Sequence, residues 1–344
     1  MGLTKLTRRE WLQASALSAL GVAGCATGTV GRTKNEVGMK NGDEMADYDV
    51  VIIGGGPAGS AAALMLGRGN RKVLLVDAGV PRNAAAVHIN GFVTRDGVTP
   101  AEFRRVAREQ LTKYAVTYEN RWVHEVRGES GDFEVVFADG VVGCRRVILT
   151  VGMVDELPDL PGFRELWGAG IFQCPYCHGW ELKGGPWGYW ASSPELAAHA
   201  AIATAWTREV VVFTDGRFEL PSDTRASLTQ RGIRIETRRL RRFVSSDDGG
   251  SPTLAAVELE DGVRVACKGL MARPPQRQTK LVAGMGLALD EMGLVTVDMM
   301  GKTSRAGIYA AGDLSTMMQS ALGAAAGGQR AAAALNHELV MAGQ

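Results

Sequence analysis

The chain has 344 residues, of which 46% are hydrophobic and 22% are charged, and its formal net charge is +1. This length and apolar content are enough for two domains, each with a core of its own. The near-zero charge gives no reason to expect a nucleic-acid partner, and five cysteines are too few for a disulfide scaffold. The 44 glycines, at ordinary charge, favour an α/β protein with many tight turns over a disordered chain.

The first 25 residues have the pattern of an export signal. The segment Thr7–Leu12 carries two adjacent arginines, resembles the twin-arginine signal of bacteria, and precedes an apolar run that is too short to span a bilayer. The run ends at Val22–Cys25, which is similar to a lipoprotein processing box whose cysteine receives the lipid. Because the twin-arginine route carries folded proteins, it would suit a protein that is loaded with a bulky cofactor before export.

These features predict a bacterial protein that is exported and is either periplasmic or anchored to the membrane by an N-terminal lipid. Residues 26–47 are polar and rich in Gly, Lys and Glu, so we expect a flexible linker there. Two alternatives remain. Signal cleavage near Ala26 would leave Cys25 unmodified, and an amphipathic helix would simply begin the folded protein.

A strand, a glycine-rich turn and a helix then follow in the order of a dinucleotide-binding unit. Residues 48–53 are apolar and β-branched, which predicts a buried strand, and they lead into the turn 54–59 and an Ala/Leu-rich helix. In such a unit the first glycine allows the tight turn, the second lets the backbone approach a pyrophosphate, and the third lets the helix pack on the strand. The next strand ends at Asp77, where a carboxylate can hydrogen-bond an adenosine ribose. The predicted nucleotide contacts are Gly54, Gly56, Pro57, Ala58, Gly59 and Asp77.

The following segments predict a helix and a hairpin. A long loop leads into a helix near residues 100–114, and residues 133–137 and 141–149 alternate like a hairpin around Asp139-Gly140. The second of these strands ends in the turn Thr150–Gly152.

The sequence Cys174-Pro175-Tyr176-Cys177-His178 places two thiols within one turn. At this spacing the sulfurs can form a disulfide, and a lowered thiol pKa makes such a pair a centre for thiol–disulfide exchange. Zinc sites use the same spacing but usually need a second cysteine pair, whereas Cys144 and Cys267 stand alone in apolar segments that predict buried, inert thiols. No metal site is therefore predicted, although a site made by the pair and His178 remains an alternative.

Near the C-terminus, residues 307–313 predict a strand that ends in Gly312-Asp313, and residues 319–340 predict one Ala/Gly-rich helix. The N-terminal amides of such a helix can stabilise negative charge on a nearby group. A plain strand–loop–helix with Asp313 as the helix N-cap is the alternative, but the glycine-rich turn earlier in the chain favours a cofactor site.

Together these segments resemble the low-molecular-weight thioredoxin reductase family of FAD-dependent pyridine nucleotide-disulfide oxidoreductases. The resemblance runs from about Tyr48 to Leu339 and rests on the two turns, the cysteine pair and the C-terminal strand and helix. It implies an α/β, three-layer fold with two Rossmann-like nucleotide-binding domains, and a homodimer. The FAD domain would be discontinuous, formed by residues 48–157 and 276–344, and the inserted NAD(P)-like domain at 158–275 would carry the cysteine pair.

The resemblance also implies a role for each site. Cys177 would lie against the flavin, Cys174 would exchange with the substrate, and Asp313 would reach the ribityl or pyrophosphate part of FAD. The reductases have an acidic residue directly after the pair, whereas this chain has His178 in a CPYCHG sequence that is closer to a branch of dithiol oxidases acting on small metabolites. His178 could carry the thiol proton, or it could have only a capping or packing role. The further FAD contacts predicted are Gly152, Gly312, Asp313, Gln319, Ser320 and Ala321.

The inserted domain departs from the reductases in its nucleotide site. Ala191, Ser192 and Ser193 stand where glycines would approach a pyrophosphate, and Glu195 adds a negative charge at the start of the following helix. The loop 214–217 holds a single arginine in place of a basic cluster. These losses predict that NADPH binding is weak or absent.

The sequence therefore predicts an FAD-dependent thiol–disulfide oxidoreductase that works as a dithiol oxidase independently of NADPH, through Cys174 and Cys177. Its partners would be a dithiol or disulfide substrate, either a small molecule or a protein, and an external electron acceptor such as oxygen. An NADPH-dependent thioredoxin reductase and a non-catalytic flavin redox sensor remain the alternatives.

Overall fold

The computed structural model describes residues 46–246 and 253–343. The predicted export signal, Cys25 and nearly all of the predicted linker lie outside these residues. No helix in the described ranges is long and apolar enough to cross a membrane.

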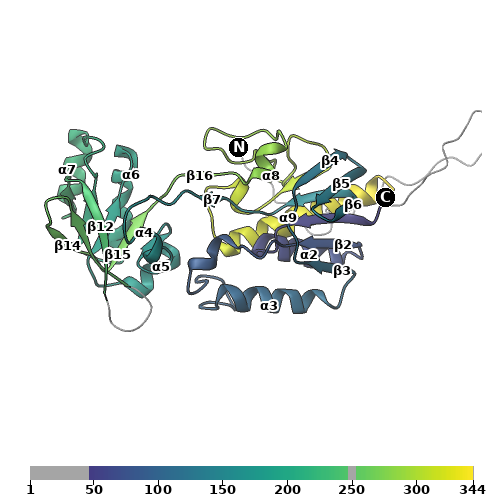
Figure 1. Cartoon of the computed structure of the whole chain (residues 1–344), viewed down its shortest axis with the longest axis horizontal. Helices are drawn as coiled ribbons and strands as arrows, with labels where there is room; N and C mark the ends of the chain where they lie inside the picture. The colour runs from purple at the N-terminus through teal and green to yellow at the C-terminus, as the bar shows by residue number, and fades with distance from the viewer. Residues whose placement is uncertain (1–45, 247–252, 344) are drawn as a thin grey trace, which may run out of the picture. The chain divides into compact units, whose positions relative to one another are not determined.

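A seven-stranded sheet is assembled from strands that lie far apart in the sequence (Figure 1). Its strand order is β3-β2-β1-β6-β5-β4, and β17 also pairs with β6. The β17–β6, β6–β1, β1–β2 and β2–β3 pairs are parallel, whereas β4, β5 and β6 form an antiparallel meander. The strands are β1 (Tyr48–Ile53), β2 (Val73–Val76), β3 (Val116–Glu119), β4 (Glu125–Glu129), β5 (Asp132–Phe137), β6 (Gly140–Leu149) and β17 (Ile308–Ala310).

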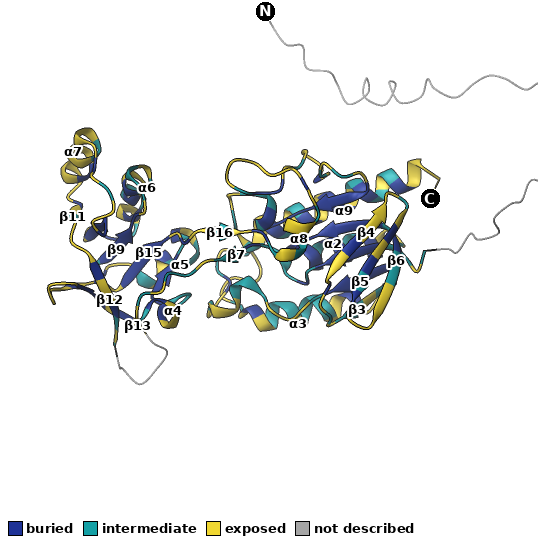
Figure 2. Cartoon of the chain, turned by 45° about the horizontal axis from the view of Figure 1, so that its top comes forward, coloured by how far each residue is buried: buried dark blue, intermediate teal, exposed yellow. Residues whose placement is uncertain are grey.

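Both faces of this sheet are covered, which is why β2 and residues 50–53 of β1 are apolar without a break. Val50 and Ile52 of β1 belong to the cluster formed with α2 and α9, whereas Val51 and Ile53 belong to the cluster on the opposite face. Figure 2 shows these strands as buried. The helices in this part of the chain are α2 (Pro57–Arg68), α3 (Pro100–Leu111), α8 (Lys280–Gly284) and α9 (Ala321–Met341), with the short 3-10 helices η1 (Arg82–Ala85) and η3 (Asp313–Ser315).

Helices α2 and α9 approach each other closely because the residues between them are small. A side chain at Gly328 of α9 would place its Cβ 2.0 Å from the carbonyl oxygen of Ala58 in α2. This contact brings the N-terminal parts of both helices, and the turns before them, to the same region of the molecule.

The middle of the chain forms a second, five-stranded parallel sheet in the order β11-β10-β9-β15-β8. A three-stranded antiparallel sheet accompanies it, in the order β12-β13-β14. The strands are β8 (Ile171–Phe172), β9 (Trp187–Trp190), β10 (Val210–Phe213), β11 (Arg234–Glu236), β12 (Leu240–Ser246), β13 (Thr253–Leu259), β14 (Arg264–Ala266) and β15 (Gly269–Ala272). The helices are α4 (Phe163–Leu166), α5 (Pro175–Leu182), α6 (Pro194–His199), the 3-10 helix η2 (Ala200–Ala205) and α7 (Ser222–Gln230).

The chain leaves the first sheet through β7 (Val154–Asp155) and returns through β16 (Gln276–Arg277). These two short strands pair with each other in antiparallel fashion, with Asp155 opposite Gln276. The two connections between the sheets therefore lie side by side.

The observed architecture confirms the predicted α/β class with Rossmann-like sheets. The first strand has the predicted bounds, and the predicted hairpin is β5–β6, to which β4 adds a strand that was not predicted. Cys144 and Cys267 are buried as predicted, and burial raises the pKa of each thiol to about 12. The alternative with Asp313 as the N-cap of the last helix is wrong, because Ser320 caps α9.

Candidate active site

Almost all of the residues that the sequence predicts for the site line one cavity. It is lined by the glycine-rich turn before α2, by the turn after β6, by the start of α9 and by the cysteine pair with His178. Gly59 does not line it. A Cβ at Gly59 would lie 1.8 Å from the carbonyl oxygen of Gly54, so this glycine allows the helix to pack on the turn. The predicted residues on the cavity wall are Gly54, Gly56, Pro57, Ala58, Asp77, Gly152, Cys174, Cys177, His178, Gly312, Asp313, Gln319, Ser320 and Ala321.

The glycine-rich turn is shaped to bind a phosphate-bearing ligand. Gly56 is the N-cap of α2, and no side chain caps this end of the helix. A Cβ built on Gly56 would have no atom within 4 Å, so the space next to it is open. Helix amides that point into open space and carry the positive end of the helix dipole favour a pyrophosphate.

Asp77 lies against this turn, in the position expected of a carboxylate that hydrogen-bonds the adenosine ribose. A Cβ at Gly55 would come 2.6 Å from its carboxylate, so the absence of a side chain at Gly55 makes room for Asp77. The Asp77 carboxylate also accepts a hydrogen bond from the Gly79 amide, at 3.1 Å. The open cradle at Gly56 together with this placed carboxylate fits the adenosine and pyrophosphate parts of FAD.

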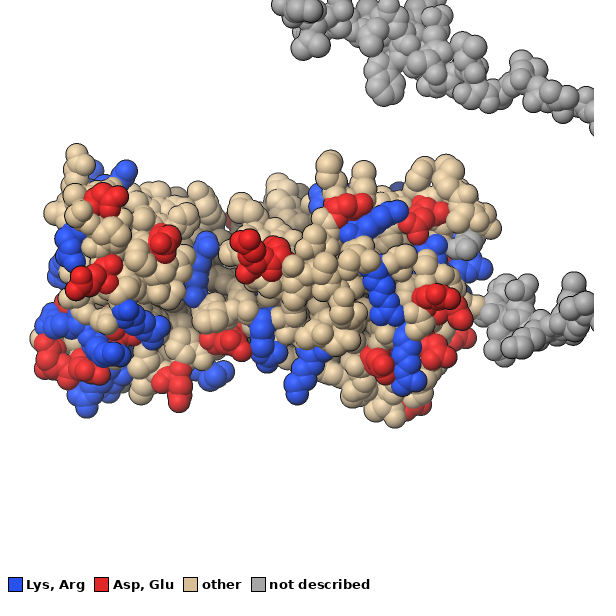
Figure 3. Space-filling view, turned by 90° about the horizontal axis from the view of Figure 1, so that it is seen from above, with Lys and Arg blue, Asp and Glu red and all other residues tan. Residues whose placement is uncertain are grey.

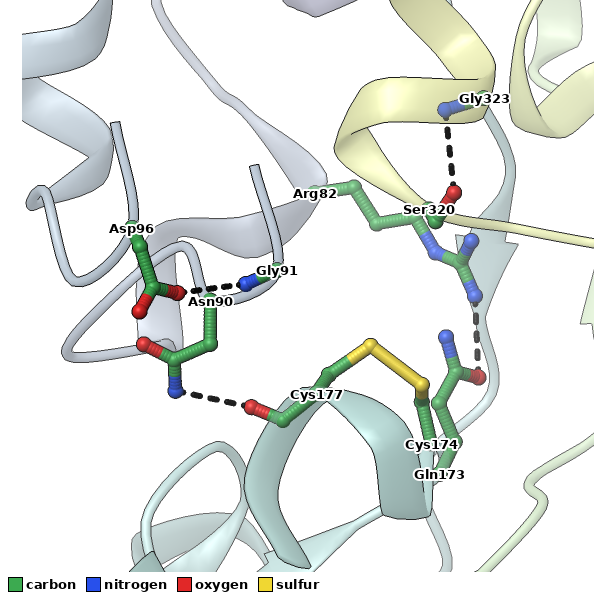
Figure 4. The surroundings of a disulfide bond; sticks show 9 residues. All are labelled: Arg82, Asn90, Gly91, Asp96, Gln173, Cys174, Cys177, Ser320 and Gly323. Atoms are coloured by element: carbon green, nitrogen blue, oxygen red, sulfur yellow. Dashed lines mark hydrogen bonds between the residues drawn. A yellow bond between two sulfur atoms is a disulfide. The ribbon is translucent and has the colours of Figure 1, made fainter. Parts of the chain in front are cut away.

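The cysteine pair opens helix α5. The structure has a disulfide between Cys174, the N-cap of this helix, and Cys177 in its first turn, with Cα atoms 5.3 Å apart. The Asn90 side chain donates a hydrogen bond to the Cys177 carbonyl oxygen at 2.9 Å, and Figure 4 shows this contact beside the disulfide. A thiolate formed at the N-terminus of a helix is stabilised by the helix amides, which lowers the thiol pKa.

His178 follows the pair and is largely enclosed. Its ring stacks on Phe172, with ring centroids 5.5 Å apart and an interplanar angle of 23°. Neither ring nitrogen has a hydrogen-bond partner among the described residues. Burial lowers the pKa of the imidazole, against the opposing effects of the Cys174 carbonyl and the Glu181 carboxylate. The packing of His178 on Phe172 is therefore observed, while its role in carrying the thiol proton stays a prediction.

A largely enclosed arginine that the sequence did not single out lines the same cavity. The Arg82 side chain forms ion pairs with Asp155 at 2.6 Å and with Asp313 at 2.7 Å. Burial raises the pKa of the Asp313 carboxyl, as does the charge of Asp155, and Arg82 acts in the opposite direction. No local pattern marks Arg82, because its partners come from remote segments of the chain.

The second nucleotide-type unit runs from β9 to α6, and side-chain interactions are found at the start of its helix and in the loop after β10. The Ser193 hydroxyl accepts a hydrogen bond from the Leu196 amide at 3.3 Å, and so caps α6. A hydrogen bond from Ser193 lowers the pKa of Glu195, which keeps a negative charge in the first helical turn. In the loop after β10, Arg217 pairs with the Asp215 carboxylate at 2.9 Å. The N-terminus of α6 is thus capped by a side chain, whereas that of α2 is not.

Surface charges are mixed. Figure 3 shows Lys and Arg interspersed with Asp and Glu over the face in view.

Within the described ranges, no group of three or more His, Cys, Asp or Glu side chains could hold a metal ion.

Comparison with known proteins identifies the family. The model of the pyridine nucleotide-disulphide oxidoreductases matches residues 48–328, which is most of the chain. The chain belongs to this family. The prediction of a thioredoxin reductase-like FAD protein is confirmed, and the chain is an FAD-dependent oxidoreductase that acts on disulfides.

Several members of the family align over most of this chain. Thioredoxin reductase sirT of Leptosphaeria maculans is 32% identical over 312 residues, which cover 85% of this chain and 94% of sirT. Thioredoxin reductase tcpT of Claviceps purpurea is 32% identical over 285 residues, which cover 79% of this chain and 88% of tcpT. Among solved structures, an oxidoreductase from Agrobacterium tumefaciens superimposes with a TM-score of 0.79 at 37% identity, over 86% of this chain and 99% of that protein.

Proposed function

We propose that this flavoprotein is a dithiol oxidase that does not rely on NADPH. The observation that carries the proposal is the start of α6, which the Ser193 side chain caps and where Glu195 places a negative charge. The neutral, unpartnered imidazole of His178 beside the cysteine pair supports it, because it offers a proton acceptor where the family's reductases have an acid.

The chain's own residues account for the sulfur chemistry. A substrate thiolate attacks the Cys174 sulfur and the disulfide opens, so that Cys177 leaves as a thiolate. The second substrate thiol then displaces Cys174, which closes the substrate's disulfide and leaves the protein's pair reduced. His178 accepts a thiol proton, and the amides at the start of α5 stabilise the thiolate. FAD, when bound, supplies the electron-pair acceptor that restores the protein disulfide, and oxygen or another external acceptor takes the electrons on.

The proposal extends to location and assembly. An exported, lipid-anchored form would follow from the N-terminal signal, and a compartment without NADPH would suit an enzyme that takes electrons from dithiols. A homodimer is expected from the family resemblance.

An NADPH-dependent disulfide reductase is the second candidate. It is favoured by the retained five-stranded parallel sheet, which has the form of a nucleotide-binding domain. Under this candidate the electrons would flow in the opposite direction, from nicotinamide to the cysteine pair.

Anaerobic mixing of the purified yellow protein with NADPH and, separately, with dithiothreitol distinguishes the two. We expect dithiothreitol to bleach the flavin absorbance and NADPH to leave it unchanged. Rapid bleaching by micromolar NADPH would reject the proposal. The variant Cys177→Ser is the control, since it should keep FAD bound and lose the reaction with dithiothreitol. Bleaching by neither reagent would favour a redox sensor.

A further inference from the structure

The Arg82 guanidinium contacts four segments of the chain at once. Its Nε and Nη2 donate to the Asp155 carboxylate at 2.8 and 2.6 Å, and its Nη1 donates to Asp313 at 2.7 Å. The same two terminal nitrogens also reach the side-chain oxygens of Gln319, at 2.8 Å, and Gln173, at 3.2 Å. The side chain is 14% exposed, so these contacts are made largely out of water.

Gln276 completes the network from the returning connection. Its amide nitrogen donates to Asp155 at 3.1 Å and to the side-chain oxygens of Gln173 and Gln319, both at 3.2 Å. In return, the Gln319 amide donates to the Gln276 oxygen at 2.8 Å. Every polar side chain in this group therefore has a partner within it, as a buried polar network requires.

The partners of Arg82 lie next to both halves of the site. Gln173 directly precedes Cys174, and Figure 4 shows the Arg82–Gln173 hydrogen bond beside the disulfide. Asp313 and Gln319 precede and border the start of α9, on the wall of the cofactor cavity. Asp155 and Gln276 face each other on β7 and β16, the two connections between the sheets.

We propose that Arg82 is a positioning residue that holds the Cys174–Cys177 segment in register with the FAD cradle. It acts through Gln173 on one side and through Asp313 and Gln319 on the other. Two further observations support this role. The planar guanidinium suits a fork of several acceptors in a way that a lysine ammonium does not. Without its charge, the carboxylates of Asp155 and Asp313 would remain near each other in a partly desolvated site.

This role does not depend on the direction of electron flow or on NADPH. It concerns only the exchange of an electron pair between the protein's sulfur pair and FAD, in which one is oxidised as the other is reduced. The proposal can therefore fail while the dithiol oxidase proposal stands, and the reverse also holds.

The test uses Arg82→Met, Arg82→Lys and Gln173→Leu in the full chain with FAD bound. The flavin is photoreduced anaerobically, and its reoxidation by the Cys174–Cys177 disulfide is followed by absorbance. We expect Arg82→Met to slow this internal step about 10-fold or more, since small displacements of reacting groups cost that much. The FAD dissociation constant of Arg82→Lys should stay within about threefold of that of the wild-type protein, because the charge opposite Asp313 remains. Its electron exchange should nevertheless be as slow as that of Arg82→Met, because lysine lacks the planar fork.

A second readout does not require the loaded enzyme. In the FAD-free protein, amide hydrogen exchange across residues 171–177 should become faster in Arg82→Met, because the anchor on Gln173 is lost. The matched control is Arg146→Met, which removes another buried arginine ion pair, to Glu338, outside the site. It should lower the melting temperature while leaving both readouts unchanged.

The double variant Arg82→Met/Gln173→Leu decides between positioning and general stability. If Arg82 acts through Gln173, the double variant should be no slower than Arg82→Met alone, whereas independent effects would multiply. The proposal is overturned if Arg82→Met exchanges electrons at the unchanged rate, or if the two effects multiply. Should Arg82→Met fail to fold, Gln173→Leu carries the test: slower exchange with FAD retained supports the proposal, and an unchanged rate overturns it.

Discussion

His178 stacks on Phe172 with ring centroids 5.5 Å apart, and the stacked ring keeps both of its nitrogens unpartnered among the described residues. The ring is thus packed face to face against an apolar side chain. Because burial lowers its pKa below the ordinary value near 6.5, the ring is neutral at pH 7 and can accept a proton.

Replacement of this histidine by glutamine should therefore slow dithiol oxidation about 100-fold, the usual size of a lost proton acceptor. In the wild-type protein the rate of dithiol oxidation should fall as the pH drops through the lowered pKa of His178. The pH–rate profile of His178→Gln should lack this decrease at low pH. The stability of the native protein should fall in the same direction, with decreasing pH. The unfolded chain binds the proton more readily, so the native protein loses stability as the pH falls below about 6.5. Identical pH–rate profiles for the two proteins would contradict an acid–base role.

Two glycines of the same turn should respond differently to an added methyl group. Gly56 has a φ of −73° and open space around its Cβ position, so alanine fits the backbone there, but its methyl group would occupy the space next to the predicted pyrophosphate. We expect Gly56→Ala to fold with an unchanged melting temperature in the FAD-free form and to bind FAD at least about 10-fold more weakly.

Gly59→Ala is the comparison for that variant. Its methyl group would lie 1.8 Å from the Gly54 carbonyl oxygen, so it should destabilise the FAD-free protein itself. Absorbance at the flavin band measures FAD content, and circular dichroism measures folding. A Gly56→Ala protein purified with its full complement of FAD would show that the turn holds no phosphate.

The sequence predicts those features of the site that are formed by residues close together in the chain. The glycine-rich turn, the strand before it and the cysteine pair at the start of α5 each follow from a few consecutive residues. Asp313 and Gln319 were predicted as FAD contacts, but Arg82 and the network that joins it to them could not be predicted in this way. The Arg82–Gln319 hydrogen bond joins residues 237 positions apart, and it exists only because β17 returns to pair with β6.

The same reasoning explains the missed strand and why the sequence left Asp313 open as an alternative cap. β4 is short and largely exposed, and it is a strand only through its pairing with β5. Asp313 and Ser320 are both good N-cap residues, and the local sequence does not say which one begins α9. The choice is made by tertiary contacts, since the Asp313 carboxylate is engaged by Arg82 while the Ser320 hydroxyl accepts from the Gly323 amide at 3.1 Å.

Removal of the cap on α6 should affect stability but not the sulfur chemistry. Ser193→Ala deletes the hydroxyl that accepts from the Leu196 amide, and loss of such a cap costs about 1 kcal/mol. Thr99→Ala at the start of α3 is the matched control, because Thr99 accepts from the Glu102 amide in the same way. Both variants should lower the free energy of unfolding in urea and react with dithiothreitol at the unchanged rate. A large loss of that reaction in Ser193→Ala alone would give Ser193 a functional role.

Glu338 of α9 should make the stability of the first sheet sensitive to acid. Burial alone would raise the pKa of its carboxyl, but hydrogen bonds from Lys302, Arg146 and Tyr309 lower it to about 2. A lowered carboxyl pKa adds stability above the unfolded value near 4.3, and this stability is lost as the pH falls towards 2. Glu338→Gln should therefore lower the free energy of unfolding by about 2 kcal/mol at pH 7. In urea titrations of the FAD-free proteins, the difference between the two should shrink between about pH 4.3 and pH 2. A difference that stays constant over this interval would mean that the Glu338 carboxylate charge contributes nothing to the anchoring of α9.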